Sequence, residues 1–136
     1  MKDKKFVESY YRVLYADTDQ AGVMYYANYL KVFELGRAEF MRVLGFTYKE
    51  LEEKEGIILP VVETYIKYKA PARYDELITV KTTLKEVKSF KIVFEYQICY
   101  NHSILAYGFT KHVPVNKEGK IVRLPEALLE VLKEVL

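Results

Sequence analysis

The chain has 136 residues, of which 51% are hydrophobic and 29% are charged, so it can bury a core and is too apolar to be disordered. Its 21 Lys and Arg against 19 Asp and Glu give a net charge of +2, which supplies no global field to hold a nucleic acid. No run approaches the ~18 apolar residues of a membrane span, and the N-terminus lacks the apolar region of a signal peptide. We therefore expect one cytoplasmic domain over residues 1–136, without a membrane span.

The first predicted element is a strand over residues 6–15. Its apolar residues alternate on one face, as in a half-buried strand: Val7, Tyr11, Val13 and Tyr15. A loop with two aspartates, Asp17 and Asp19, follows the strand and is closed by Gly22. This loop connects the strand to a helical pattern.

A long helix is predicted to begin near Tyr26 and to end at Gly45. Its apolar residues recur at helical spacing: Tyr26, Tyr29, Leu30, Phe33, Phe40, Met41 and Leu44. Gly36 interrupts the pattern, and because a glycine within a helix costs about 1 kcal/mol relative to alanine, we expect the backbone to approach a sheet closely there. Thr47 and Glu50 have the spacing of a capping box, which predicts a short second helix.

The remaining chain alternates β-like runs with turns. The four runs cover residues 57–69, 77–87, 90–100 and 104–115. Pro125 then opens a C-terminal helix with an apolar stripe formed by Leu128, Leu129, Leu132 and Leu136. The order strand, long helix, short helix, four strands and helix predicts an α+β fold, in which a curved antiparallel five-stranded sheet wraps around one long central helix.

The loop with the two aspartates lies directly before a helix start. A carboxylate in this place can face free backbone N–H groups of the helix across a small gap. A carbonyl compound in the gap would meet a base or nucleophile on one side and the amides near Tyr25 and Tyr26 on the other. This arrangement predicts acyl transfer or hydrolysis by Asp19; the structural alternative is an aspartate that caps the helix or a turn. For Asp17 we expect the structural role.

The segment 15–29, Tyr-Ala-Asp-Thr-Asp-Gln-Ala-Gly-Val-Met-Tyr-Tyr-Ala-Asn-Tyr, resembles the aspartate-x-aspartate-x-x-glycine loop and helix start of the hotdog-fold acyl-CoA thioesterases. The chain is most similar to the 4-hydroxybenzoyl-CoA thioesterase family, in particular its Tol-Pal-associated (YbgC-like) branch. Two further segments match in the right order, Tyr-Lys-Ala-Pro-Ala-Arg-Tyr-Asp at 68–75 and Lys-Ser-Phe at 88–90. The resemblance therefore covers nearly the whole chain and implies the hotdog fold.

The resemblance also implies an activity, the hydrolysis of an acyl-CoA to a free carboxylic acid and CoA without a cofactor. Asp19 takes the position of the catalytic aspartate, and the N–H that polarises the thioester carbonyl falls at Tyr26. Many YbgC-like members have histidine in place of Tyr26, so a backbone role is the one that carries over. Contacts to the acyl-CoA are expected from Gly22, Tyr25, Lys88, Ser89 and Arg123. Family members commonly pair their sheets, which implies a homodimer or a homotetramer.

Other polar residues have weaker patterns. Glu34 and Glu39 are second carboxylate candidates on the long helix, although each has an arginine three residues on, as in a solvated ion pair. His102 lies in a predicted turn, and His112 has the pattern of a hydrogen-bonded structural residue. One cysteine and two well-separated histidines give no metal site of ordinary spacing. Candidate partners for CoA phosphates are Arg73, Lys88, Lys91 and Arg123.

Three alternatives to a thioesterase stay open at this point. A non-catalytic module could bind an acyl group or CoA without turnover. A hotdog dehydratase would require a histidine near the aspartate loop, and this loop has none. A nucleic-acid binder could use basic residues among tyrosines, namely Lys67, Lys69 and Arg73. The preferred acyl group cannot be predicted, because selectivity depends on pocket volume.

Overall fold

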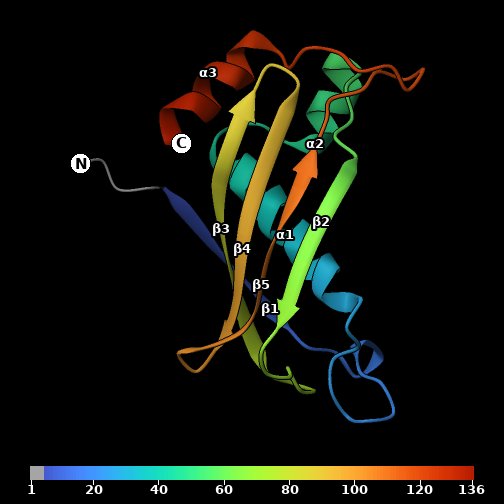
Figure 1. The fold of residues 1–136 in the computed structure, drawn as a ribbon, viewed down its shortest axis with the longest axis vertical. Coiled ribbons are helices and arrows are strands. Elements are labelled where there is room, and N and C mark those ends of the chain that lie inside the picture. The colour runs from blue at the N-terminus through green and yellow to red at the C-terminus, as the bar shows by residue number, and fades with distance from the viewer. Residues whose placement is uncertain (1–4) are drawn as a thin grey trace.

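The computed structural model describes residues 5–136 (Figure 1). Residues 1–4, which contributed to the prediction that the chain lacks a signal peptide, lie outside the described residues. In chain order the elements are β1 (Phe6–Arg12), the 3-10 turn η1 (Tyr15–Asp17), α1 (Asn28–Val43), α2 (Tyr48–Glu50), the π-helical turn η2 (Leu51–Glu55), β2 (Val61–Tyr68), β3 (Leu77–Lys88), β4 (Lys91–Tyr100), β5 (Ser103–His112) and α3 (Glu126–Val135).

The five strands form one open antiparallel sheet in the order β1-β3-β4-β5-β2. Figure 1 shows α1 lying across one face of the sheet, which curves around it, and α3 lying at the end where β3 and β4 meet. Since the sheet is antiparallel, with short turns joining β3, β4 and β5, and the long helix covers one face, the predicted α+β architecture is confirmed. Within residues 5–136, no helix combines the length and apolarity needed to cross a membrane.

Gly36 allows α1 to lie close against β3. A Cβ atom at this position would overlap the hydroxyl of Thr82 and would lie 3.2 Å from a methyl of Val80. The close approach predicted for this glycine is therefore confirmed. Aromatic side chains complete the contact between helix and sheet: the ring of Phe33 on α1 stacks on Tyr96 of β4 with centroids 4.2 Å apart.

The boundaries of the first strand and of the long helix differ from the prediction. The strand ends at Arg12, because the Asp17 carboxylate accepts a hydrogen bond from the Leu14 N–H and turns the chain, so Tyr15 is 77% exposed in η1. The helix begins at Asn28, and Tyr26 is exposed in the preceding turn instead of lying on the buried stripe. Leu30 is also exposed, at 39%.

The later elements follow the prediction closely. Thr47 Oγ1 accepts a hydrogen bond from the Glu50 N–H at 3.1 Å and begins α2. The second strand begins at Val61, since Pro60 has no N–H to donate to a ladder and the residues before it form only an isolated bridge, Ile58 with Val115. The stripe of α3 is buried at Leu128, Leu129 and Leu132, whereas Leu136 is 52% exposed.

Candidate active site

The loop with the two aspartates is closed by hydrogen bonds between its own arms. Thr18 and Met24 form an antiparallel bridge. The Asp19 N–H donates to the Val23 carbonyl at 2.9 Å, and the Gly22 N–H donates to the Asp19 carbonyl at 3.0 Å. Gly22 has a φ of +81°, which a residue with a Cβ rarely adopts. The tight turn at 19–22 therefore requires the glycine.

The segment before β3 forms backbone hydrogen bonds with this loop. The Met24 N–H donates to the Ala72 carbonyl at 2.8 Å, and Val23 forms an antiparallel bridge with Arg73. Ala72 in turn donates its N–H to the hydroxyl of Tyr29 at 3.1 Å. The motif at 68–75 thus lies beside the aspartate loop, and Arg73 is the predicted phosphate partner that is found at this end of the molecule.

Asp17 is a buried structural residue, as expected. Its side chain is 4% exposed and accepts hydrogen bonds from the Tyr11 hydroxyl at 2.6 Å, the Leu14 N–H at 2.8 Å and the Lys31 ammonium at 2.5 Å. Burial by itself raises the pKa of Asp17, but the hydrogen bonds from Lys31, Tyr11 and Leu14 outweigh burial and lower the pKa. Its carbonyl accepts from the Asn28 side chain at 2.8 Å and so joins the loop to α1.

Asp19 lies two residues further along the loop and is exposed. One carboxylate oxygen, Oδ1, accepts the Ala21 N–H at 2.9 Å, which is the turn-capping role of the structural alternative. Among residues 5–136, no other hydrogen bond or ion pair to the Asp19 side chain is found. The carboxylate therefore has a free oxygen directed to solvent, as a base or nucleophile requires. Its charge also contributes to the raised pKa of the Tyr29 hydroxyl, after burial and Glu76.

The turn before α1 presents two backbone donors. The Tyr25 N–H donates to the Asp17 carbonyl at 2.8 Å, so this amide already has an acceptor, and a substrate contact of Tyr25 stays a prediction. Within the described part of the chain, no hydrogen bond uses the N–H of Tyr26 or of Ala27. Tyr26 thus has a free N–H at the helix start, as the sequence predicted, and Ala27 adds a second one that the sequence analysis missed.

Four tyrosines surround this turn. The Tyr68 ring lies edge-on to Tyr26 and to Tyr29, with centroids 6.4 Å and 4.9 Å away, and its hydroxyl donates to the Tyr26 carbonyl at 2.7 Å. Tyr25 packs against Tyr26 with centroids 4.6 Å apart, and this neighbour raises the pKa of Tyr25, with a smaller contribution from the charge of Asp19. Tyr68 was not among the predicted site residues, although it is the first residue of the matching motif at 68–75.

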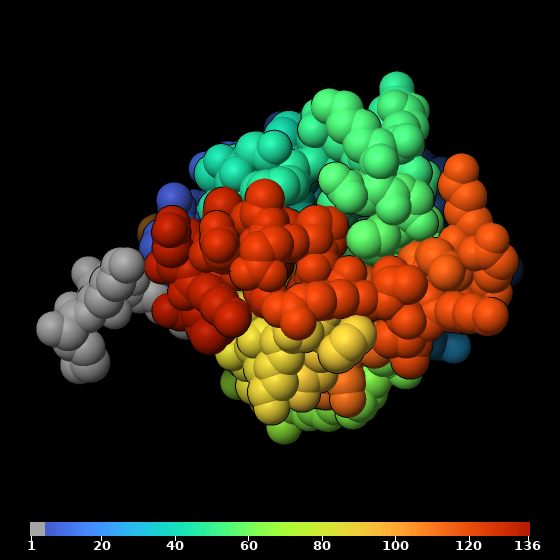
Figure 2. All heavy atoms as spheres, turned by 90° about the horizontal axis from the view of Figure 1, so that it is seen from above, coloured from blue at the N-terminus to red at the C-terminus, as the bar shows by residue number. Residues whose placement is uncertain are grey.

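The other predicted CoA contacts lie at the opposite end of the sheet. β3 has 12 residues, and at about 3.3 Å per residue its two ends are roughly 35 Å apart. The aspartate loop adjoins the Leu77 end, whereas Lys88 and Ser89 form the β3–β4 turn at the other end. Figure 2 looks onto that end, where the turn and α3 lie together. One chain therefore does not bring Asp19 together with Lys88, Ser89 and Arg123.

The basic side chains at this second end already have partners. Lys88 lies 3.4 Å from Glu86, Lys91 lies 2.8 Å from the same carboxylate, and Arg123 lies 3.4 Å from Glu126. The Ser89 carbonyl accepts the Leu124 N–H at 2.8 Å. The pairs of Lys88 and Arg123 are exposed, so a phosphate could displace them at little energetic cost, whereas the Lys91 side chain is only 25% exposed.

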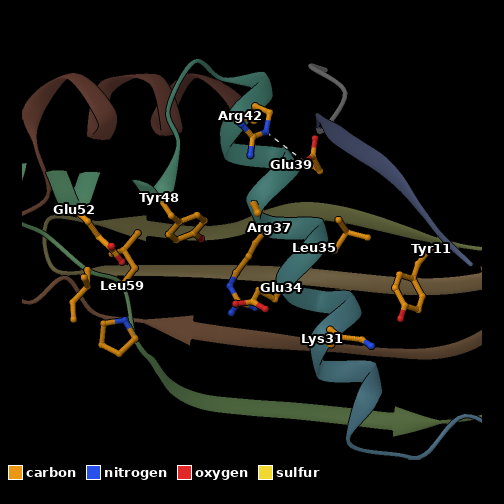
Figure 3. Close-up of a pocket in the computed structure, with 13 residues that line it drawn as sticks. Tyr11, Lys31, Glu34, Leu35, Arg37, Glu39, Arg42, Tyr48, Glu52 and Leu59 are labelled. Atoms are coloured by element: carbon orange, nitrogen blue, oxygen red, sulfur yellow. Dashed lines mark hydrogen bonds and ion pairs between the residues drawn. The ribbon is translucent and has the colours of Figure 1, made fainter. Parts of the chain in front are cut away.

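A cavity of about 730 Å³ follows the exposed side of α1 (Figure 3). It extends from Tyr11 and Lys31 to Tyr48 and contains both carboxylate candidates of the helix. Glu39 pairs with Arg42 at 3.4 Å, which confirms its structural interpretation, whereas no ion pair between Glu34 and Arg37 is found among the described residues. The Tyr48 hydroxyl is buried against the cavity and has no hydrogen-bond partner within residues 5–136.

Buried polar side chains form a hydrogen-bonded chain that ends at Leu59, a residue that lines this cavity. Tyr96, Thr110 and His112 are linked by contacts of 2.5 Å and 2.8 Å. His112 Nδ1 donates to the Leu59 carbonyl at 2.9 Å, because a carbonyl can only accept. Burial, with a smaller contribution from the charge of Arg37, outweighs the hydrogen bond to the Leu59 carbonyl and lowers the pKa of His112 to about 4. The predicted structural role of His112 is confirmed; His102 lies exposed in the β4–β5 turn.

Comparison with known proteins agrees with this fold. Residues 13–132 match the family model described as the thioesterase-like superfamily. The chain belongs to this superfamily. YbgC of Haemophilus influenzae, named as an acyl-CoA thioesterase, is 39% identical to the thioesterase-like chain over 100 residues, which cover 74% of each protein. The YbgC acyl-CoA thioesterase of Helicobacter pylori is 34% identical over 131 residues, covering 92% of this chain and 96% of the relative.

Solved structures give the same result. The DHNA-CoA thioesterase of Staphylococcus aureus superposes on the thioesterase-like chain with a TM-score of 0.92 at 30% identity, over 96% of this chain and 90% of the other. The resemblance to hotdog-fold acyl-CoA thioesterases inferred from the sequence is therefore confirmed. The assignment to a Tol-Pal-associated branch stays a prediction.

Proposed function

We propose that the protein hydrolyses an acyl-CoA to a free carboxylic acid and CoA, with Asp19 as the reacting carboxylate and the Tyr26 N–H as a donor to the thioester oxygen. One observation supports this most directly. An exposed carboxylate with a free oxygen, that of Asp19, lies a few residues before a helix start whose N–H groups have no acceptor. The names of the relatives point to the same substrate class. No step in this reaction requires a cofactor.

Asp19 can act in the hydrolysis by either of two routes. As a general base, Asp19 removes a proton from water, the hydroxide attacks the thioester carbon, the C–S bond breaks and the CoA thiolate takes up the proton. As a nucleophile, Asp19 attacks the carbon itself, the thiolate leaves, and water hydrolyses the mixed anhydride. In both routes negative charge develops on the carbonyl oxygen, where a free N–H is worth about 10²–10³ in rate. One turnover in H₂¹⁸O separates them, because only the nucleophilic route can place label in the Asp19 carboxylate.

The site that we propose is completed by a second copy of the chain. β2 is an edge strand whose outer edge is unpaired, with Val61, Val62, Tyr65 and Tyr68 all more than 40% exposed. An apolar edge of this kind favours pairing with another strand. Two β2 strands that pair antiparallel about a two-fold axis would place the β3–β4 turn of the second copy at the Asp19 end of the first. A CoA bound at Asp19 would then reach Lys88 and Ser89 of that second copy.

A thiol-release assay with a panel of acyl-CoAs tests the activity. The panel contains short, branched, long and hydroxylated aromatic acyl groups, since the preferred acyl group is open and the DHNA-CoA thioesterase names one aromatic candidate. We expect turnover by the natural protein and a loss of about 10²–10⁴-fold in kcat for Asp19→Asn, with the thermal midpoint unchanged. Saturable binding without turnover would instead identify a non-catalytic acyl or CoA-binding module.

Light scattering during size-exclusion chromatography tests the two-chain site. We expect a homodimer, or a homotetramer made of two such dimers, over the concentrations at which the protein is active. A monomer with full activity would contradict the shared site without contradicting hydrolysis by Asp19. The cytoplasmic location expected from the sequence stays a prediction.

A further inference from the structure

Tyr68 contacts the turn that presents the free N–H groups. Its hydroxyl donates to the Tyr26 carbonyl at 2.7 Å, and this is the shortest hydrogen bond to that carbonyl. Among residues 5–136, the one other hydrogen bond to this carbonyl comes from the Tyr29 N–H of α1, at 3.4 Å. The hydrogen bond from Tyr68 to the Tyr26 carbonyl is therefore the stronger of the two, and the one from the first turn of α1 is weak.

The Tyr26 carbonyl and the Ala27 N–H belong to the same peptide group. No peptide bond of the described residues is cis, so the C=O and N–H bonds of this planar group point in opposite directions. A donor on the carbonyl side thus sets the direction in which the Ala27 N–H points. It also draws electron density toward the oxygen, which makes the N–H a better donor.

The Tyr68 ring has the packing needed to hold the hydroxyl in place. It meets the rings of Tyr26 and Tyr29 edge-on, and Tyr29 is 2% exposed and is itself tied to the Ala72 N–H. Tyr68 is the last residue of β2, so its backbone is fixed by the ladder to Ala106 on β5. The hydroxyl is consequently placed by the sheet and not by the loop that it contacts.

We infer that Tyr68 is a positioning residue for thioester hydrolysis: through its hydrogen bond to the Tyr26 carbonyl it orients and polarises the Ala27 N–H, which joins the Tyr26 N–H as a second donor to the thioester oxygen. The inference rests on the proposed function for its catalytic part. Its structural part, the effect of one hydroxyl on one amide, does not depend on that function.

The test is Tyr68→Phe, which removes the hydroxyl and keeps the ring contacts. We expect kcat to fall about tenfold, the loss that corresponds to one neutral hydrogen bond, while KM changes less than about twofold. A residue that only supports the fold would lower the thermal midpoint instead, so the midpoint is measured beside the kinetics. The matched control is Tyr10→Phe on β1, because Tyr10 is 61% exposed and its replacement should leave kcat, KM and the midpoint unchanged.

A second measurement is independent of turnover. In ¹H–¹⁵N spectra, Tyr68→Phe should shift the Ala27 amide proton upfield, while Tyr10→Phe leaves it in place. An unshifted Ala27 amide, or a shifted amide with undiminished kcat, would overturn the inference. If the natural protein hydrolyses none of the acyl-CoAs, the proposed function fails, and the amide shift still decides whether Tyr68 controls the Ala27 N–H.

Discussion

Asp17 and Asp19 are two residues apart in one loop and have opposite environments. Asp17 is buried, and three donors, including the Lys31 ammonium, occupy its carboxylate. Asp19 is exposed, and its carboxylate accepts a single hydrogen bond within residues 5–136, from the Ala21 N–H. The same side chain thus stabilises the loop at one position and is available for chemistry at the other. Burial and the number of donors, and not residue type, separate the two roles.

Replacement of Asp17 by alanine should give the largest loss of stability. The substitution leaves the Leu14 N–H and the Tyr11 hydroxyl without their acceptor, at a cost of about 3 kcal/mol, or roughly 10 °C in thermal midpoint. The ion pair with Lys31 adds little, because the Lys31 side chain is 45% exposed. Asp19→Ala is the matched control, and its midpoint should stay within about 1 °C of the natural protein. Equal thermal midpoints for Asp17→Ala and Asp19→Ala would show that Asp17 does not stabilise the loop more than Asp19 does.

The free energy of unfolding should depend on pH because His112 is buried. The pKa of His112 is lowered from 6.5 to about 4, so the unfolded chain takes up a proton before the folded one does. Stability should be constant above about pH 7 and should fall as the pH decreases from about 6.5 toward 4, with a loss of about 2 kcal/mol at pH 5. Urea unfolding between pH 7.5 and 5 measures this loss. His112→Gln should flatten the profile in that window, and a flat profile in the natural protein would show that His112 titrates normally.

The smallest effect is expected at the exposed basic end. Lys88→Ala removes one solvent-exposed phosphate contact, so the KM for an acyl-CoA should rise about threefold, more at low salt than at high salt, with kcat unchanged. Lys49→Ala is the control, because Lys49 is exposed and paired with Glu53 at 4.0 Å in the same way as Lys88 is paired with Glu86. If neither Lys88→Ala nor the salt concentration changes the KM, the CoA phosphates bind elsewhere, and Arg73 beside the aspartate loop is the next candidate.

The position of the loop was predictable because its signals are local. A glycine with positive φ at position 22, an aspartate that caps its own turn and a helix start within a few residues depend on neighbours in the chain. The close approach at Gly36 was predictable for a different reason, since only a packing demand explains a glycine inside a helix. The exposed Tyr15 and Tyr26 were misjudged, because hydrogen bonds from Leu14 and Tyr25 to Asp17 turn the chain and remove both rings from the buried faces.

Periodicity and turn residues were thus sufficient for the α+β architecture, the order of the elements and the pair of aspartates ahead of the helix, because each of these depends on residues close together in the chain. Contacts between distant segments depend on the folded sheet. The sheet order brings Tyr68 to the helix start, 42 residues away in sequence, and carries Lys88 to the end opposite Asp19. A hydrogen bond such as that of Tyr68 leaves no periodic signal, since it requires two residues to meet only after the strands have paired.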